Sequence, residues 1–436
     1  MQASKTNKGG DTTNLYRYFV LGMLTLVYVF NFIDRQLLVT LQESIKKDLG
    51  LSDTQLGLLS GFTFAIFYVG LGVPIARYAD KHNRRNTITV SLAIWSAMTA
   101  LSGMARNFAQ LLLARIGVGV GEAGGSPPAH AMISDYFPPQ KRSTALSIYS
   151  SGIYFGVLIG FLMGGYLNQV LGWRTAFLIL GIPGVVFSIL FQVCVREPRR
   201  GATDTAPGQD AHSFAVVLKH LFATKTFAYL ASGAALHVFC IYGLLNWAAS
   251  FLIRLHAMTK ADAGRSLGLV LGIGGAIGSF GGGWLTDYFG KKDKRRYLTI
   301  PAYAIILSLL FAAGGLFLPG NFTAVLCIGL CASLQSMYLG PSLAVTHSLV
   351  PASMRSVASA IFFLAINLIG LGLGPLTVGF LSDMLKPSMG EESLRWGMSC
   401  IIVVGAIAII LFFIAARKLA LDVNAKAAGK QVKVAV

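Results

Sequence analysis

Four ionisable residues lie inside stretches of this chain that are otherwise almost wholly apolar. Asp34 and Arg35 are neighbours in the first stretch, and Arg115 and Glu122 lie seven residues apart in the fourth. Charged side chains are costly at membrane depth, so they are rare there unless they line a wet cavity, pair with each other or carry function. In a chain of apolar helices these four residues mark a predicted transport pathway.

The spacing of these charges along their helices limits how they can meet. Adjacent residues point about 100° apart on an α-helix, so Asp34 and Arg35 cannot both aim at one spot. Arg115 and Glu122 are two turns apart on one helix face, with Glu122 about 10 Å deeper. We therefore expect one residue of each doublet to cross to the other helix, either Asp34 toward Arg115 or Arg35 toward Glu122.

This arrangement predicts proton coupling. Burial disfavours the charged form of a carboxylate, whereas a neighbouring guanidinium favours it. A conformational change that separates Asp34 or Glu122 from its arginine would therefore drive proton uptake. Arg35 and Arg115 suit an anionic head group, because a guanidinium binds phosphate in a bidentate manner. The alternative is a fixed cluster of buried ion pairs that only sets helix register.

The elements that must hold these charges are predicted to be membrane helices. Of the 436 residues, 54% are apolar and 12% are charged, and the mean hydropathy is +0.64. Twelve apolar segments reach the roughly 20 residues that a spanning helix needs. They cover residues 16–41, 54–79, 86–105, 109–135, 144–170, 174–195, 226–254, 264–288, 297–317, 322–349, 356–382 and 396–417. The predicted fold class is an all-α, multi-pass integral membrane protein with twelve transmembrane helices.

The distribution of basic residues predicts the orientation. If both termini are cytoplasmic, 25 of the 36 Lys and Arg residues fall in the tails and the even-numbered connections, nine on the opposite side and two in the membrane. This is the positive-inside bias, so we predict that both termini are cytoplasmic. The net charge of +18 then reflects orientation and contact with anionic lipid, and we predict no nucleic-acid partner.

The chain is predicted to divide into two six-helix lobes. A polar segment rich in turn formers covers 197–212, and helical apolar periodicity over 213–224 predicts a short interfacial helix. We therefore expect an N-terminal lobe over 1–196, a cytoplasmic connector over 197–225, and a C-terminal lobe with a cytoplasmic tail over 226–436.

Two short motifs recur in both halves in the same order. Asp80, in a basic loop after the second segment, corresponds to Asp287 after the eighth at an offset of 207 residues. Arg142, in a Pro-containing loop, corresponds to Arg355 at an offset of 213 residues. Two matches at nearly equal offsets predict a duplicated six-helix unit, and such repeats place the substrate site near the midplane at their interface.

The first of these loops, Gly-x-x-x-Asp-x-x-Gly-x-Arg, resembles the signature of the major facilitator superfamily. In the first copy Ala76 and Asn83 replace glycines, although Asn tolerates the left-handed backbone that a glycine would supply. The resemblance covers the whole chain and implies a latch between neighbouring helices when a transporter faces outward. The predicted latch residues are Asp80, Arg84, Arg85 and Asp287. A solvated basic loop that only obeys the positive-inside rule is the alternative.

A narrower resemblance, to the spinster branch of the superfamily, rests on two strings. They read Asn31-Phe-Ile-Asp34-Arg35 and Arg115-Ile-Gly-Val-Gly-Val-Gly-Glu122-Ala, where the family carries Asn-Tyr-x-Asp-Arg and Val-Gly-x-Gly-Glu-Ala. Phe32 replaces the usual Tyr, which removes a hydroxyl and keeps the ring. Spinster proteins export lysophospholipids and sphingoid phosphates, so the resemblance implies an amphiphilic anion with one tail as substrate.

Polar residues of the second half are further candidates for substrate binding. They are His237, Asn246, Gln335 and Tyr338. A lone His or Tyr in an apolar helix is more often a packed residue with one local hydrogen bond, which is the alternative for these four.

Glycines recur every fourth residue along the fifth segment, at Gly152, Gly156, Gly160 and Gly164, and Gly165 follows. Small residues on one face let the backbone of a neighbouring helix come close. Such interfaces suit rocking of one lobe against the other, and static tight packing uses the same glycines. A glycine-rich signature of superfamily antiporters lies at this place, which favours antiport, although its Gly-Pro core is absent.

We therefore predict a proton-coupled secondary active transporter of an amphiphilic organic anion, of the lysophospholipid or sphingoid phosphate type, that works by alternating access. The first alternative is a transporter of a smaller organic anion, such as a sugar acid or carboxylate, with a smaller and more polar cavity. The second is a channel or a non-transporting sensor on the same scaffold.

Other classes of function are disfavoured. The chain has no Gly-Lys-Ser/Thr phosphate-binding string, and no nucleophile–His set suggests an enzyme. Cys327 and Cys331 share a helix face without His or carboxylate neighbours, so we predict no metal and no cofactor. The predicted partners are the amphiphilic anion, protons and membrane lipids, and we expect a monomer in a bacterial inner membrane.

Overall fold

Each of the twelve predicted apolar segments lies on a helix or on consecutive helical segments. The computed structural model describes residues 8–200, 214–351 and 354–427. In the first half the elements are α1 (Lys8–Leu49), α2 (Asp53–Gly57), the π-helical segment η1 (Leu58–Phe62), α3 (Thr63–Lys81), α4 (Arg84–Ser102), α5 (Phe108–Glu122), α6 (Ser126–Tyr136), α7 (Pro139–Val170) and α8 (Gly172–Cys194). The fourth predicted segment is thus broken, because a turn over residues 123–125 separates α5 from α6.

The second half has the same character. Its elements are α9 (Phe214–Ala223), α10 (Lys225–Leu255), α11 (Lys260–Gly290), α12 (Arg296–Phe317), α13 (Asn321–Gln335), η2 (Ser336–Tyr338), α14 (Leu339–Ser348), α15 (Arg355–Ala365), the π-helical segment η4 (Ile366–Leu371), α16 (Gly372–Met389), η5 (Gly390–Glu392) and α17 (Ser393–Ala427). Several helices extend beyond the apolar segments, because polar residues continue the helical backbone at both ends.

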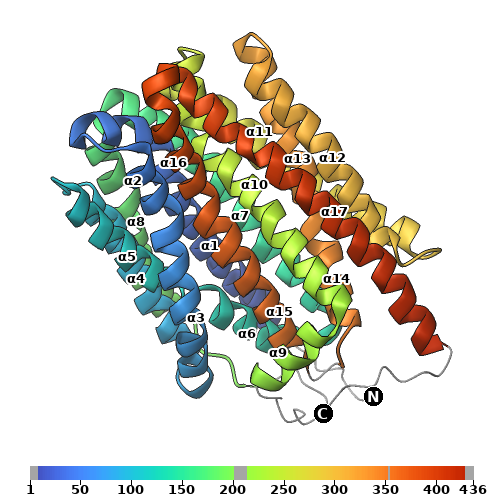
Figure 1. The fold of residues 1–436 in the computed structure, drawn as a ribbon. Coiled ribbons are helices and arrows are strands. Elements are labelled where there is room, and N and C mark those ends of the chain that lie inside the picture. The colour runs from blue at the N-terminus through green and yellow to red at the C-terminus, as the bar shows by residue number, and fades with distance from the viewer. Residues whose placement is uncertain (1–7, 201–213, 352–353, 428–436) are drawn as a thin grey trace, which may run out of the picture.

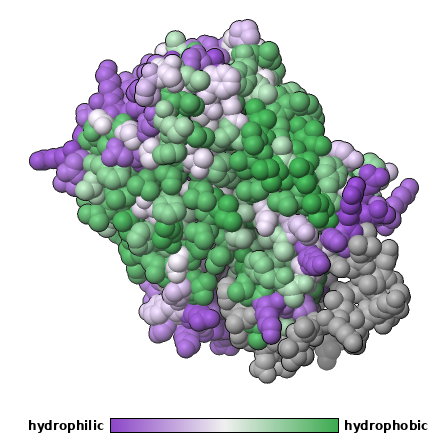
Figure 2. Space-filling model, in the orientation of Figure 1, coloured by the Kyte–Doolittle hydropathy of each residue, from purple (hydrophilic) through white to green (hydrophobic). Residues whose placement is uncertain are grey.

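The molecule has the surface expected of a membrane protein. Figure 2 shows an apolar band across the visible face of the bundle, with hydrophilic residues gathered toward its two ends. In the described residues, nine helical stretches are long and apolar enough to cross a membrane. The last of them, Val357–Leu419, contains the reversal at Gly390 between α16 and α17, which lie side by side. The all-helical membrane fold is therefore confirmed, whereas the number of spans and the side of the termini stay predictions.

Figure 1 shows the blue-to-green helices of the first half beside the yellow-to-red helices of the second. The long helices α1 and α7 pack along each other in the first half, and α10 packs along α17 in the second. Two seams join the halves, one between α7 and α11, the other between α2–η1 and α16. We call the two ends of the bundle the α2 end and the α9 end, after the short helices at each (Figure 1).

Both seams are closest toward the α2 end, where glycines let backbones touch. A Cβ atom on Gly264 of α11 would lie 2.4 Å from the Phe161 carbonyl oxygen of α7, and one on Gly379 of α16 would lie 2.3 Å from the Asp53 carbonyl oxygen. Any larger residue at either position would therefore push the two halves apart at this end.

The predicted glycine row of the fifth segment is on α7 but does not form a seam. A Cβ on Gly156 would lie 2.5 Å from the Phe32 Cβ of α1, so the row packs against a helix of its own half. The next residue, Gly165, faces the other way and would place a Cβ 2.6 Å from the Lys260 carbonyl oxygen of α11. Close packing is therefore confirmed, but only Gly165 among these glycines packs across the halves.

The predicted short helix after the connector is present as α9 at residues 214–223. Val217 and Leu221 are buried in the core of the second half, and α9 packs on α10 and α15. Residues 201–213 of the predicted connector lie outside the described residues.

Candidate functional site

The four predicted charges come together where α1 and α5 cross. Asp34 and Arg35 lie two thirds of the way along α1, and Glu122 is the last residue of α5. Gly121 brings α5 against α4, since a Cβ there would lie 2.7 Å from the Trp95 backbone nitrogen. Two prolines at the start of α6, Pro127 and Pro128, help to end the preceding turn. The break in the fourth segment therefore lies directly beside Glu122.

Arg35 forms the ion pair of this cluster. Its Nε donates to Glu122 Oε2 at 2.7 Å, which is one of the two crossings expected from the sequence. The guanidinium carbon lies 4.7 Å from the ring centre of Phe64, 5.0 Å from that of Tyr68 and 5.1 Å from that of Phe32. The aromatic faces attract the cation and hold the guanidinium in place.

Asp34 and Arg115 are buried but only partly satisfied. In the described residues, Asp34 Oδ2 and the Nε and Nη1 atoms of Arg115 are buried without a hydrogen-bond partner. The second oxygen of Glu122, Oε1, is in the same condition. The charges of Asp34 and Arg115 attract each other, but within the described residues these two side chains form no ion pair within 4.0 Å. Because unpaired buried polar groups are costly, this half-satisfied cluster is suited to accept a further partner.

The cluster borders a narrow cavity that both halves line, with about 300 Å³ of empty space that includes open solvent. Its lining residues are Arg35, Gln36, Val39, Ser60, Phe64, Arg115, Tyr242, Leu245, Asn246 and Leu371. The arginines come from α1 and α5 of the first half, and Tyr242 and Asn246 come from α10 of the second. A ligand in this cavity would contact both halves at once and would place a head group beside two guanidinium groups.

The candidate residues of the second half divide into two groups. Asn246 lines the cavity, and its amide donates to the Tyr242 carbonyl at 2.9 Å. His237 lies instead in the core of the second half, with Nε2 2.9 Å from the Gln335 carbonyl oxygen and its ring 4.8 Å from that of Tyr338. These three residues meet each other outside the cavity described above, and their role in substrate binding stays a prediction.

Sequence reasoning missed several lining residues. Gln36 and Ser60 are polar residues in apolar segments, which is a usable signal, but Tyr242 has none. Ser60 lies in η1 and Leu371 in η4, the two π-helical segments. π-Helical turns occur frequently at functional sites, and apolar periodicity does not distinguish them from ordinary α-helix.

The predicted latch residues lie at the α9 end and contact residues of their own half. Arg84 bonds to Asp135 at 2.5 Å and lies 3.6 Å from Asp80. The backbone amides of Arg84 and Arg85 donate to the Glu197 carboxylate, which the sequence did not predict. In the second half, the Tyr297 hydroxyl donates to Asp287 at 3.0 Å. Their action as a latch stays a prediction.

Comparison with known proteins decides the family, because residues 24–375 match the Major Facilitator Superfamily. The chain belongs to this superfamily. The spinster resemblance is also confirmed by the structure of a bacterial homologue of the human lysosomal transporter spinster in an inward-facing, unoccupied conformation. The match has a TM-score of 0.86 and 31% identity and covers 93% of this chain and 98% of that one. An inward-facing, occupied structure gives 0.83, with 32% identity and the same coverage.

Relatives with named activities include transporters of unlike substrates. An MFS-type efflux pump of Mycolicibacterium smegmatis is 34% identical over 395 residues, 89% of each chain. A hexuronate transporter of Bacillus subtilis is 27% identical over 407 residues, 90% of this chain and 94% of that one. A sphingosine-1-phosphate transporter of Danio rerio is 26% identical over 444 residues, 94% of this chain and 86% of that one. All three relatives are transporters, and the substrates named for two of them are different.

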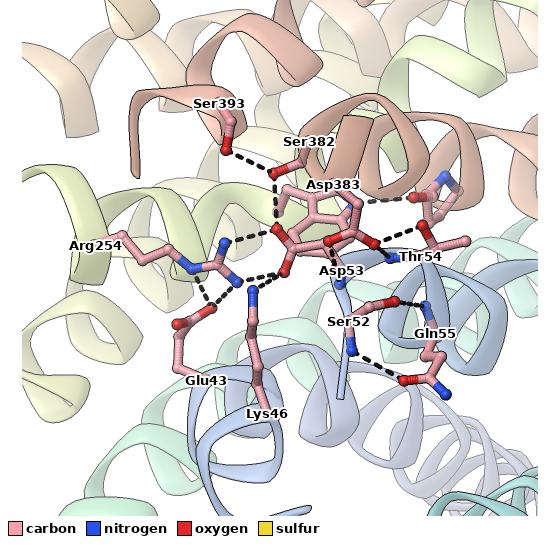
Figure 3. Close-up of polar contacts among 12 residues, drawn as sticks. Glu43, Lys46, Ser52, Asp53, Thr54, Gln55, Arg254, Ser382, Asp383 and Ser393 are labelled. Atoms are coloured by element: carbon pink, nitrogen blue, oxygen red, sulfur yellow. Dashed lines mark hydrogen bonds and ion pairs between the residues drawn. The ribbon is translucent and has the colours of Figure 1, made fainter. Parts of the chain in front are cut away.

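A second charged cluster of this major facilitator protein joins the halves at the α2 end (Figure 3). Arg254 of α10 donates from Nη1 and Nη2 to the two oxygens of Asp53, each at 2.8 Å, and from Nε to Glu43 at 2.8 Å. Lys46 of α1 donates to Asp53 at 2.5 Å, and the Ser382 hydroxyl of α16 donates to it at 2.7 Å. Asp53 is fully buried and both of its oxygens are bonded.

Asp383 of α16 extends this cluster by capping a helix of the other half. One of its oxygens accepts from the Asp53 backbone amide at 3.0 Å, and the other accepts from the Thr54 amide at 2.7 Å and the Thr54 hydroxyl at 2.6 Å. A carboxylate at a helix N-terminus is favourable because the first amides lack partners within the helix. We call Glu43, Lys46, Asp53, Thr54, Arg254, Ser382 and Asp383 the α2-end network (Figure 3).

Proposed function

We propose that this superfamily member is a proton-coupled secondary active transporter of an amphiphilic organic anion, of the lysophospholipid or sphingoid phosphate type, working by alternating access. The observation that carries the proposal is Arg115. It is buried beside the cavity, and two of its guanidinium nitrogens have no partner among the described residues, while the neighbouring Arg35 already holds Glu122. A phosphate or carboxylate head group is the chemistry that would satisfy those nitrogens.

Charge balance supports coupling to protons. The cluster of Asp34, Arg35, Arg115 and Glu122 has no net charge when all four residues are ionised, so an added anion would leave it negative. Uncompensated charge at this depth is costly, and proton uptake by Asp34 or Glu122 removes it. An anion that competes with Glu122 for Arg35 would have the same effect, because it would leave that carboxylate without its partner.

The closed α2 end supports an orientation. Both seams and the α2-end network close this end, and the chain is similar to two structures described as inward-facing. We propose that the α2 end faces the outside, that both termini and α9 face the cytoplasm, and that the twelve helices form two six-helix lobes. The latch residues Asp80, Arg84, Arg85 and Asp287 would then lie on the open side and engage when the protein faces outward. We propose a monomer in a bacterial inner membrane.

The test is transport by the purified protein in proteoliposomes, with and without a pH gradient. The panel contains lysophosphatidic acid, lysophosphatidylcholine, sphingosine 1-phosphate, glucuronate and a neutral monoacylglycerol. We expect flux of the anionic amphiphiles that rises when a pH gradient is imposed and little flux of glucuronate. Flux without any response to the gradient would refute proton coupling, and flux of glucuronate alone would refute the amphiphile.

A smaller organic anion is the second candidate. The roughly 300 Å³ of empty space at the cavity includes open solvent, and its narrow interior favours a small anion over a ligand with a long acyl chain in this conformation. The hexuronate transporter among the relatives points the same way. On the amphiphile proposal the tail must extend beyond this cavity, along the apolar residues Val39, Leu245 and Leu371 that share its lining.

A further inference from the structure

Two fully buried polar side chains between the central cavity and the α2-end network have no hydrogen-bond partner in the described residues. Gln42 of α1 has neither its amide oxygen nor its amide nitrogen bonded, and the Ser250 hydroxyl of α10 is also unbonded. Neither residue belongs to the central charge cluster or to the α2-end network. Buried amides and hydroxyls are almost always bonded in native structures, so both residues require an explanation.

Helix geometry places Ser250 in a row of polar residues along α10. Asn246, Ser250 and Arg254 lie four residues apart on one face of α10, about 6 Å per step. The first lines the cavity and the last belongs to the network, so Ser250 lies midway between them. α10 packs against α1, so this face lies along the boundary between the halves.

The facing helix repeats the pattern. Val39, Gln42 and Lys46 lie at positions i, i+3 and i+7 of α1, on one face. Val39 lines the cavity and Lys46 bonds to Asp53 in the network. Gln42 therefore lies at about the same depth as Ser250, on the side of α1 that meets the second half.

An unbonded amide in a sealed interface is costly, so a conformation that supplies it with partners would be favoured. If the α2 end opens, a gap forms between the row on α1 and the row on α10. Water or a solute that enters this gap contacts both rows. Arg254 then moves away from Glu43 and Asp53, which remain with Lys46 on the first half. Asp383 stays on the half of Arg254 but on the other side of Asp53 (Figure 3). Arg254 is thereby left in need of an anion.

We propose that Gln42, Ser250 and Arg254 form a second anion-binding site, which is closed here and which receives the head group of the substrate when the α2 end opens. The site rests on the proposed function in one respect, the identity of its ligand as the transported head group. Its chemistry is one guanidinium with a neutral amide and a hydroxyl, which fits a phosphate or carboxylate monoanion. The α2-end network then holds this end closed, and on opening Arg254 exchanges the carboxylates of Glu43 and Asp53 for the head group of the substrate.

The experiment measures thiol reactivity at Ser250→Cys in the full chain, after replacement of the five free native cysteines. Membrane-impermeant methanethiosulfonates of either charge are added to each side of proteoliposomes. Ala249→Cys is the matched control, because Ala249 is equally buried in the core cluster and next in sequence. Asp383→Asn opens the network without touching Arg254, and Thr54→Val, which removes one hydroxyl donor, is a milder second variant.

We expect the cysteine at position 250 to react slowly in the closed protein and at least about tenfold faster with Asp383→Asn, from the α2 side only, because a bond to a charged group is lost. The cysteine at position 249 should stay unreactive in both. The anionic reagent should be faster than the cationic one, and Arg254→Gln should abolish that preference.

Equal and slow reaction at positions 250 and 249 in Asp383→Asn, Thr54→Val and Arg254→Gln would overturn the proposal. So would acceleration with no preference for the anionic reagent, because the row would then be hydrated without being an anion site. These readouts need no substrate. If the expected labelling pattern is seen and the transport panel fails, the site stands and the proposed function falls; the reverse result removes only this site.

Discussion

The two charged clusters of this transporter use the same residue types and differ in how completely they are bonded. The central cluster joins α1 to α5 within one half. Within the part of the chain that the structure describes, it has one ion pair and leaves atoms of Asp34, Arg115 and Glu122 buried without partners. The α2-end network joins the two halves, and both oxygens of Asp53 are bonded. A fully bonded polar network is rigid and specific, whereas a partly bonded one is costly as it stands.

This difference in bonding indicates that the two clusters have different roles, although they contain the same residue types. The α2-end network stabilises the one conformation in which its partners meet, since the side-chain hydrogen bonds of Arg254 and Asp383 cross between the halves. On the proposed mechanism the central cluster would move as part of one half and would gain partners from a ligand, from water or from protons. The α2-end network would then set which end is open, and the central cluster would set what is bound.

Removal of Arg254 is the strongest test of this comparison. Arg254→Gln leaves Glu43 and Asp53 buried with Lys46 as the remaining cation, and breaking a buried pair on one side costs about 3–5 kcal/mol. We expect a large fall in thermal stability in detergent and loss of transport. The control is Arg174→Gln at the same end, where Arg174 pairs with Asp48 on the surface. An exposed pair contributes about 0–1 kcal/mol. Equal small losses in both variants would mean that the network does not stabilise the closed end.

The central cluster should respond in function more than in stability. Glu122→Gln keeps the shape of the side chain and removes its charge. The charged hydrogen bond to Arg35 that is lost is worth about 1.5–3 kcal/mol, so we expect pH-driven uptake to fall by at least about tenfold. The protein should remain folded by size-exclusion chromatography. Asp53→Asn is the matched carboxylate in the other cluster, and there we expect altered conformation with the pH dependence of the remaining flux kept. Unchanged pH dependence in Glu122→Gln would remove this residue from coupling.

The sequence was sufficient for the helices and for the central cluster. Uninterrupted apolar runs fix where helices form, and a charge inside such a run is conspicuous, which is why Asp34, Arg35, Arg115 and Glu122 were found. The pairing of Arg35 with Glu122 was one of two crossings that helix geometry allowed, and only packing could choose between them. The glycine row of α7 shows the same limit, because the spacing of the glycines predicts close packing but does not predict which helix packs against them.

The α2-end network could not be found in this way. Lys46, Asp53 and Asp383 lie just outside the predicted apolar segments, where charges are ordinary, and their sequence positions are more than 300 residues apart at the extremes. These charges can be recognised as one cluster only when it is known how the two halves pack against each other in this conformation. The cavity residue Leu371 was missed for a related reason, since it lies in the π-helical segment η4, which apolar periodicity does not distinguish from ordinary α-helix.

The smallest expected effect concerns Arg35 and tests whether the central cluster contacts the head group of the substrate. Arg35→Lys keeps a positive charge beside Glu122 but removes the planar fork that lies among the rings of Phe32, Phe64 and Tyr68. Lysine makes a point contact with a phosphate and has three freely rotating donors, so binding of anionic amphiphiles should weaken by about 1 kcal/mol, roughly fivefold. Binding of a neutral monoacylglycerol should not change. Equal losses for both ligands, measured by displacement of a fluorescent lysolipid, would show that Arg35 orders the helices and does not contact the head group.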